Sequence, residues 1–221
     1  MLLAVDTSNA QMGLAVYDGS QVIGEFAWRS GQRHTVELAP AITDLLTRCS
    51  LTMDQLSVLG VAIGPGSFTS LRVGLALVKG LALARRIPLI GIPTLDILAR
   101  AQPVGELPLG VAIQAGRGRF ALGWYRSVGS QWQAQGELRV VTLEALQAEV
   151  KSRSVICGEF TAAERQAILE NKNVQLASPA DSIRRPAVLA ELAWARFQTG
   201  DVDDAASLAP IYLHTAAATD A

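Results

Sequence analysis

Apolar runs alternate with polar turns along the whole chain, and their spacing predicts two halves built in the same way. Strands are expected at 2–5, 12–17, 21–28 and 59–63, then at 109–114, 119–126, 137–141, 155–158 and 174–176, with short or extended segments at 87–92 and 211–213. Helices are expected at 34–49, 71–84 and 95–101, then at 143–150, 162–170 and 186–199. The stretch 102–108, with two prolines and a glycine, is the best boundary between the halves.

The stretch 64–72, Gly-Pro-Gly-Ser-Phe-Thr-Ser-Leu-Arg, joins a predicted strand to a long apolar helix. A glycine loop that opens a helix presents free N–H groups to an anion, and Ser67, Thr69 or Ser70 can cap such a helix. A P-loop needs a lysine followed by Ser or Thr, whereas the nearest lysine, Lys79, lies about two helical turns further on. The stretch is therefore either a weaker phosphate loop or a tight strand-to-helix turn.

The predicted helix 71–84 is apolar nearly all round, which indicates that it is buried on more than one side. Its charged residues, Arg72 and Lys79, share one face. Ala76, Gly80 and Ala84 form a stripe of small side chains along which a second helix can approach closely. One face is expected to pack on the sheet of this chain, and the other predicts a further helix, which can belong to another protein.

Composition places the chain among ordinary globular proteins. Its 221 residues, 50% hydrophobic and 18% charged, can form one large domain or two small lobes. The net charge of -1 argues against tight nucleic-acid binding by this chain alone, so a partner would supply most contacts to any RNA. Cys49 and Cys157 are expected to be reduced and buried. No basic leader or apolar run of membrane-spanning length is found, which predicts a cytoplasmic protein without a membrane segment.

Three strands followed by alternating helices and strands in each half are typical of the two-lobed, actin-like α/β fold (ribonuclease-H-related, ASKHA), in which each lobe is a mixed sheet with flanking helices. The expected lobes are 1–102 and 103–214, with the last segment packing back on the first lobe and 215–221 forming a flexible tail. In this fold the first hairpin faces a cleft between the lobes, where active members bind nucleotide phosphates. The nucleotide-cleft candidates are Asp6, Thr7, Ser8, Gly64, Gly66 and Ser67. Asp, Thr and Ser at a strand end also commonly cap turns.

Several stretches of the sequence carry a more specific resemblance. They are Leu-Ala-Val-Asp-Thr-Ser at 3–8, Arg-His-Thr at 33–35, Leu-Ala-Pro at 38–40, the glycine block 64–74, Lys-Gly-Leu-Ala at 79–82 and Pro-Ile-Tyr-Leu at 210–213. With these motifs the chain resembles the TsaB (YeaZ-like) family. Its members are paralogues of TsaD that take part in making threonylcarbamoyladenosine next to the anticodon of tRNA.

The resemblance implies a non-catalytic scaffold that binds no cofactor. It implies pairing with a TsaD-like protein through the helices of the first lobe, an additional TsaE-like ATPase, a possible homodimer of the chain alone, and tRNA contact only through the complex. The expected partner interface consists of His34, Leu38, Ile42 and Leu45 on the first helix and Arg72, Ala76, Lys79, Gly80 and Ala84 on the second.

Parts needed for catalysis are missing from the sequence. Its two histidines, His34 and His214, are 180 positions apart, which argues against a metal site, and no Gly-x-Ser-x-Gly elbow is present. Members of the family often have Asp-Ala-Arg where this chain has Gln-Ala-Gly at 114–116. The cluster Arg184-Arg185-Pro186 is interpreted as a solvated helix start.

An alternative of another class is an actin-like ATPase or small-molecule kinase. It would use Asp6, Thr7 and the glycine loop around ATP with magnesium in the cleft. Saturable ATP binding that is lost in Asp6→Ala would distinguish this enzyme from a scaffold.

Overall fold

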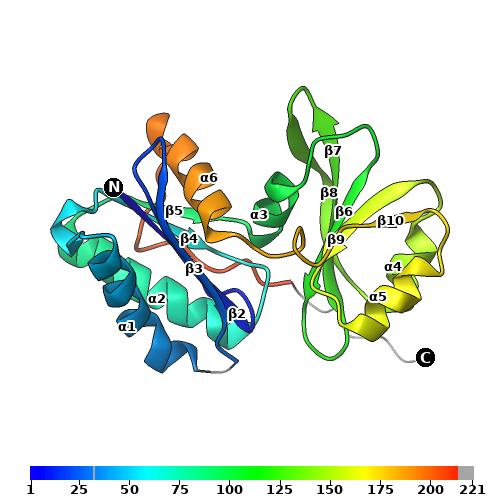
Figure 1. Cartoon of the computed structure of the whole chain (residues 1–221), viewed down its shortest axis with the longest axis horizontal. Coiled ribbons are helices and arrows are strands. Elements are labelled where there is room, and N and C mark those ends of the chain that lie inside the picture. Colours follow the sequence, from blue (N-terminus) through cyan, green and yellow to red (C-terminus); the bar gives the residue numbers. More distant parts are fainter. Residues whose placement is uncertain (32, 214–221) are drawn as a thin grey trace.

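The computed structural model describes residues 1–31 and 33–213, which form two lobes side by side (Figure 1). His214 and the tail expected at 215–221 lie outside the described residues. Each lobe is a five-stranded mixed sheet with helices on both faces, as the sequence predicts.

The two sheets have the same strand order. The first has the order β3-β2-β1-β4-β5, and its strands are β1 (Leu2–Asp6), β2 (Gln11–Tyr17), β3 (Val22–Arg29), β4 (Val58–Ala62) and β5 (Leu89–Ile92). The second has the order β8-β7-β6-β9-β10, and its strands are β6 (Leu109–Gln114), β7 (Phe120–Val128), β8 (Gln131–Val141), β9 (Ser154–Gly158) and β10 (Val174–Leu176). In each sheet the first three strands are antiparallel and the last two run parallel to the central strand. The central strands are apolar along their length because helices cover both faces.

Helices α1 (His34–Arg48) and α2 (Phe68–Arg85) cover the outer face of the first sheet, and a short 3₁₀ turn (Met53–Gln55) precedes β4. Helices α4 (Leu143–Glu149) and α5 (Ala162–Leu169) cover the corresponding face of the second sheet. The two remaining helices, α3 (Thr94–Ala101) and α6 (Pro186–Gln198), lie between the sheets and contact each other.

These two inner helices correct the expected division at 102/103, because each covers the sheet of the other half. Leu95 and Leu98 of α3 pack against Val111 of the second sheet. Leu189 and Ala193 of α6 pack on the first sheet, where Gly60 of β4 leaves room for Ala193. Helical periodicity reveals that a helix has an apolar face but not which sheet that face covers.

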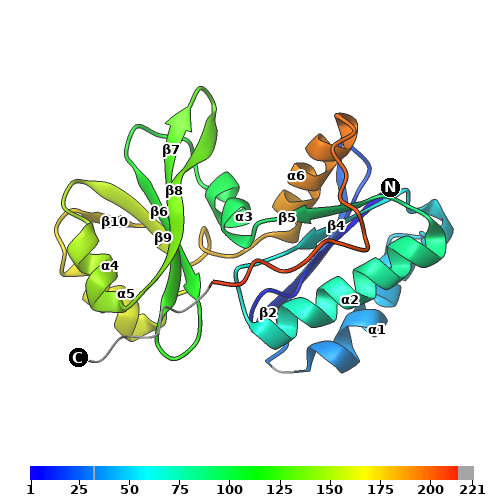
Figure 2. The same ribbon diagram turned by 180° about the vertical axis from the view of Figure 1, so that it is seen from behind.

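The segment after α6 also returns to the first lobe and runs along α2 (Figure 2). Asp203 N–H donates to the Leu89 carbonyl at 2.9 Å, and Ile211 N–H donates to the Ile63 carbonyl at 2.7 Å. Lys79 of α2 donates to the carbonyl oxygens of Ala206 and Leu208. The end of the described chain is thereby held against the first lobe.

Candidate functional site

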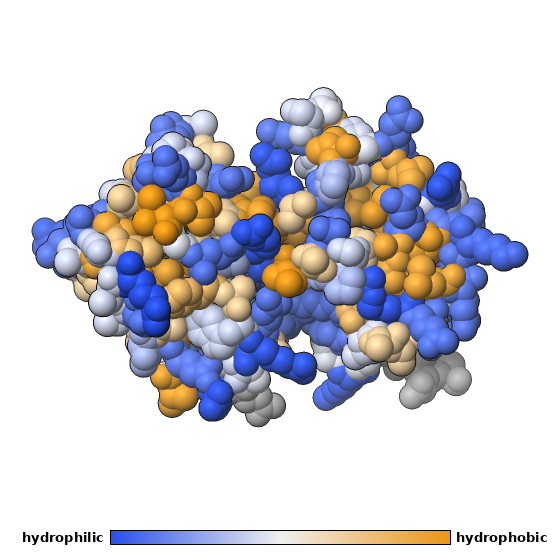
Figure 3. All heavy atoms as spheres, viewed as in Figure 1, coloured by the Kyte–Doolittle hydropathy of each residue, from blue (hydrophilic) through white to orange (hydrophobic). Residues whose placement is uncertain are grey.

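A hollow of about 1290 Å³ lies between the lobes (Figure 3). On the first lobe it is lined by Asn9, Trp28, Arg29 and the glycine loop, and on the second by residues that follow β6 and β9. Of the six nucleotide-cleft candidates, Gly66 and Ser67 line this hollow. Asp6, Thr7, Ser8 and Gly64 are buried behind it.

The side chains that follow β1 make their hydrogen bonds within the protein. Thr7 Oγ1 donates to the Ser70 carbonyl at 2.8 Å, and the hydroxyls of Ser8 and Thr94 are joined by a hydrogen bond of the same length. Asp6 is 2% exposed, and its Oδ1 accepts the Ser8 N–H at 2.8 Å. The first hairpin is therefore tied to α2 and α3.

The glycine loop packs directly against the end of β1. Ser67 N–H donates to the Ser8 carbonyl at 2.6 Å and lies 3.1 Å from Asn9 Oδ1. A Cβ at Gly66 would lie 2.3 Å from the Ser8 carbonyl oxygen, so a side chain there would clash with backbone. Ser67 occupies the N-cap of α2, but its side chain accepts no backbone N–H, contrary to the capping expectation. Glycine at this position allows close backbone packing, which favours the strand-to-helix turn over a phosphate loop.

Arg184 corrects the interpretation of the 184–186 cluster as a solvated helix start. Its side chain is fully buried and its Nε donates to Asp6 Oδ2 at 2.8 Å. Its Nη2 donates to the Gln11 carbonyl at 2.9 Å, and its Nη1 pairs with the Glu159 carboxylate. The neighbouring Arg185 is exposed and pairs with Glu25 on β3. The sequence contains no signal that separates these two adjacent arginines.

The donor set of the cleft does not fit a magnesium nucleotide. Both oxygens of Asp6 are occupied by protein donors, and one of these donors is the cation Arg184. Within residues 1–31 and 33–213 no three His, Cys, Asp or Glu side chains are grouped to hold a metal ion. His34 is 3% exposed, and its Nε2 donates to the Asn9 carbonyl at 2.8 Å, since a carbonyl oxygen can only accept.

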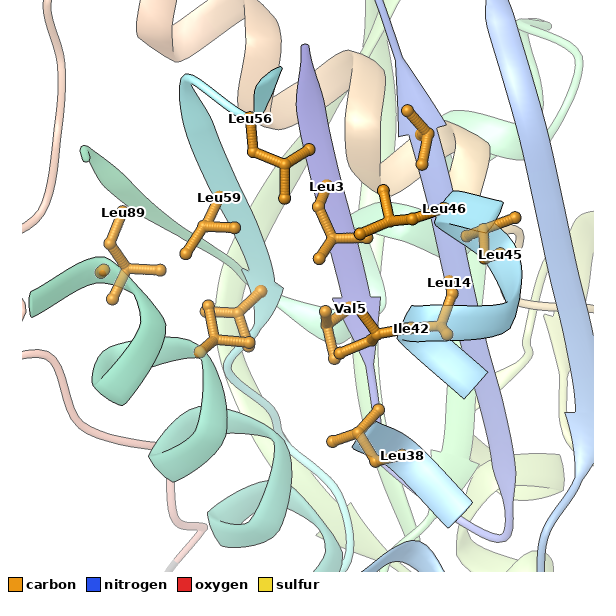
Figure 4. Packing of buried hydrophobic residues seen from close by; sticks show 14 of the residues in the cluster. Leu3, Val5, Leu14, Leu38, Ile42, Leu45, Leu46, Leu56, Leu59 and Leu89 are labelled. Carbon is orange, nitrogen blue, oxygen red and sulfur yellow. The ribbon is translucent and has the colours of Figure 1, made fainter. Parts of the chain in front are cut away.

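The predicted interface residues on α1 are buried within this chain, although Leu38 also lines a groove between α1 and α2. His34, Leu38, Ile42 and Leu45 are all at most 4% exposed. Figure 4 shows Leu38, Ile42 and Leu45 pointing into the sheet toward Val5 and Leu14. The period of the helix was identified correctly, but the apolar face belongs to the core of the first lobe, where burying each Leu or Ile contributes roughly 1.5–3 kcal/mol.

The predicted stripe on α2 is on the surface. Ala76, Gly80 and Ala84 are exposed, and a Cβ added at Gly80 would meet no atom within 4 Å. Leu83, on the same exposed side of the helix, is 63% exposed. Lys79 is half-buried under the C-terminal segment, which removes it from the stripe.

A groove of about 520 Å³ lies between α1 and α2 beside this stripe. Thr35 and Ala39 line it from α1, and Phe68, Arg72 and Ala76 line it from α2. The guanidinium of Arg72 stacks over the Phe68 ring at 3.7 Å and donates to the Tyr212 hydroxyl at 2.8 Å. We call the stripe and this groove together the α1–α2 face. Thr35 and Ala39 were not among the predicted interface residues. At about 100° per residue they lie beside the buried Ile42 and Leu46, at the edge of the apolar face of α1.

Trp28, which lines the cleft, stabilises the negative charge of Glu37 on α1. The indole N–H of Trp28 donates to Glu37 at 3.0 Å, and this hydrogen bond lowers the pKa of the Glu37 carboxyl. The contact links the wall of the cleft to the first turn of α1.

Comparison with known proteins identifies the family of the chain. The family profile described as TsaD, tRNA N6-adenosine threonylcarbamoyltransferase, matches residues 28–218. The chain belongs to this family.

Individual relatives agree with the TsaB resemblance. The chain is 34% identical over 125 residues to the tRNA threonylcarbamoyladenosine biosynthesis protein TsaB of Bacillus subtilis, which covers 57% of this chain and 55% of that protein. It is 32% identical over 99 residues to TsaB of Escherichia coli. This alignment covers 45% of this chain and 42% of that protein. The aligned part thus spans about half the length of these curated relatives. The resemblance to TsaB is confirmed.

The structure of YeaZ from Pseudomonas aeruginosa superposes with a TM-score of 0.77 at 22% identity, covering 96% of this chain and 99% of that chain. At this identity the superposition shows the fold alone, and it confirms the two-lobed, actin-like architecture. Among residues 1–31 and 33–213 no helix is long and apolar enough to cross a bilayer.

Proposed function

We propose that this chain is a non-catalytic subunit that pairs with a TsaD-like protein in forming the threonylcarbamoyl group on the adenosine next to the tRNA anticodon. The observation that carries the proposal is the α1–α2 face, where α2 leaves small residues and Leu83 exposed beside a groove. The relatives named as threonylcarbamoyladenosine biosynthesis proteins supply the reaction.

The proposed occupant of the α1–α2 face is the equivalent helix pair of a TsaD-like chain. A TsaD-like protein shares the family of this chain, so its first lobe is expected to have a corresponding pair. Small residues at Ala76, Gly80 and Ala84 allow helix axes to approach to about 8 Å, and a specific interface buries roughly 800 Å² on each side. The same face would serve a homodimer when the partner is absent, so the two assemblies would compete.

The absence of catalysis and of a cofactor is part of the proposal. Asp6 is neutralised by Arg184 and buried behind the cleft, which supports a chain that uses no ATP or magnesium. A net charge of -1 supports tRNA contact only through the complex. A TsaE-like ATPase is proposed as a further member of that complex, and cytoplasm as its location.

Size-exclusion chromatography with light scattering tests the pairing, on this chain alone and mixed with the TsaD-like protein of the same organism. We expect a one-to-one complex that replaces any homodimer. Gly80→Leu should weaken the complex by at least tenfold while the far-UV spectrum is preserved and the Tm does not fall, because the added side chain projects outward and leucine favours helix over glycine. Gly105→Leu is the matched control, since this glycine is also exposed with open space around it but lies in the connection between the halves.

Two results would contradict this function. Complex formation that is unaffected by Gly80→Leu would place the interface elsewhere on the chain. Failure to associate, together with saturable ATP binding that is lost in Asp6→Ala, would support the actin-like ATPase or kinase instead. Isothermal titration with ATP and magnesium measures the second point directly.

A further inference from the structure

A cluster of buried and half-buried polar groups joins the two lobes at the wall of the cleft. Its centre is the guanidinium of Arg184, whose side chain is fully buried. Asp6 comes from the end of β1 in the first lobe, and Glu159 follows β9 in the second lobe. The guanidinium lies between these two carboxylates.

Two of the three guanidinium nitrogens donate hydrogen bonds, and the third makes an ion pair. Nε donates to Asp6 Oδ2 at 2.8 Å, Nη2 donates to the Gln11 carbonyl at 2.9 Å, and Nη1 pairs with the Glu159 carboxylate. A planar fork with donors at fixed angles can hold three acceptors in one arrangement, whereas the single nitrogen of lysine cannot.

The outer oxygens of both carboxylates are also held. Asp6 Oδ1 accepts the Ser8 N–H at 2.8 Å, and Glu159 Oε2 accepts the Asn9 amide at 2.7 Å. Asn9 also accepts the Ser67 N–H through its Oδ1 at 3.1 Å, which extends the cluster to the start of α2. The cluster is therefore connected on both sides of the cleft.

The acceptors around the guanidinium are two carboxylates and a backbone carbonyl, which are hard oxygen groups of the kind that binds a divalent cation. Here the positive charge is part of the chain. We propose that Arg184 is an interlobe latch, an internal cation that replaces a diffusible one and fixes the orientation of the two lobes without a ligand. The chain would then present the α1–α2 face from a rigid body.

The interlobe distance tests the latch directly. Spin labels at Thr47→Cys on α1 and Leu169→Cys at the end of α5, in a Cys49→Ser background, report this distance by pulsed electron resonance; both label sites are exposed. Cys157 can remain, because burial raises the pKa of its thiol to about 11 and protects it from labelling near neutral pH. Mixing the labelled chain with an excess of unlabelled chain removes distances between copies in any homodimer. We then expect one narrow distance peak, unchanged by ATP with magnesium.

Arg184→Ala should broaden this peak and lower the Tm by on the order of 10 °C, because the buried Asp6 carboxylate and the half-buried Glu159 carboxylate lose their cation. Millimolar guanidinium should narrow the peak again by refilling the site. Arg185→Ala is the matched control, since Arg185 is adjacent but exposed and pairs with Glu25 within reach of solvent. Its peak should remain narrow.

A narrow, unchanged peak in a folded Arg184→Ala protein would overturn the latch, even if the Tm falls. Should that variant fail to fold, the peak width of Glu159→Gln decides between the two outcomes. This substitution retains the shape of the side chain and removes only the carboxylate charge contributed by the second lobe. A broadened peak supports the latch and an unchanged peak overturns it. The experiment needs no partner protein, so failure of the proposed pairing would leave its result intact.

Discussion

The two lobes share one strand order but differ in the helices that cover their outer faces. The outer helices of the second lobe, α4 and α5, have 7 and 8 residues, and each starts with a threonine that caps it, Thr142 or Thr161. Those of the first lobe, α1 and α2, have 15 and 18 residues and start without a side-chain cap. The short pair is stabilised at its ends, whereas the long pair depends on core packing. The long pair also keeps an outer face that can bind a partner.

The strand ends beside the cleft differ in the same comparison. In the first lobe Asp6 is paired with Arg184, and in the second lobe Gln114 lies near the Glu159 carbonyl at 3.4 Å. Asp6 is linked to Glu159 through Arg184, and Gln114 contacts Glu159 directly. Protein groups already occupy the polar side chains at these strand ends, so the sheet topology alone does not make a nucleotide site.

The largest expected effect tests whether α1 is held by its core face. Leu38→Ala should lower the free energy of unfolding by about 2–5 kcal/mol, because it leaves a cavity under the helix. Val36→Ala, at a position 66% exposed on the same helix, should change it by less than about 0.5 kcal/mol. Urea unfolding measures both. Equal losses would mean that the assigned inner and outer faces of α1 are wrong.

A second pair of variants compares two glycines of α2. A Cβ at Gly74 would lie 2.2 Å from Thr7 Oγ1, so Gly74→Ala should cost about 1–3 kcal/mol through displacement of β1 from the helix. Gly80→Ala should raise stability by up to about 1 kcal/mol, because alanine favours helix and the site is open. Thermal unfolding of both proteins gives the signs. A stabilising Gly74→Ala would show that β1 and α2 are not closely packed.

The capping difference between the lobes predicts a smaller effect. The Thr161 hydroxyl accepts the Glu164 N–H, and the Glu164 carboxylate accepts the Thr161 N–H. Thr161→Ala should therefore cost about 1 kcal/mol, whereas Ser67→Ala at the start of α2 should cost less than about 0.5 kcal/mol. Hydrogen exchange of the first turn of each helix localises the loss. The comparison of the lobes fails if Ser67→Ala is the more costly of the two.

The smallest effect concerns α3, which lies in the first half of the sequence but packs on the second sheet. Burial raises the pKa of Asp96, although the Tyr125 hydroxyl donates to it at 2.7 Å. A raised carboxyl pKa means that the folded state loses stability as the pH rises above the unfolded pKa. Asp96→Asn retains an acceptor for Tyr125, so it should be slightly more stable than the parent chain at pH 7. The difference should vanish as the pH falls below the unfolded pKa; a difference constant with pH would contradict this reason.

Much of the fold was predictable because local patterns determine local structure. The apolar runs at 2–5, 59–63 and 109–114 predicted their strands to within one residue. The exposed stripe Ala76, Gly80 and Ala84 was also visible, since its spacing is a property of one helix. The repeated order of strands and helices predicted the two-lobed arrangement, which the sheets of the structure and the superposition confirm.

The remaining features depend on contacts between residues distant in sequence, and only the tertiary structure decided them. Leu38 and Ala76 both lie on helices of the first lobe, but the sheet covers one and leaves the other exposed. Helix α3 packs on the second sheet and helix α6 on the first, because the path of the chain brings each apolar face to the sheet of the other half. Arg184 and Arg185 are adjacent and chemically identical, yet one is buried between two carboxylates and the other lies on the surface. A charge becomes internal only when folding brings its partners to it, 178 positions away in the case of Asp6.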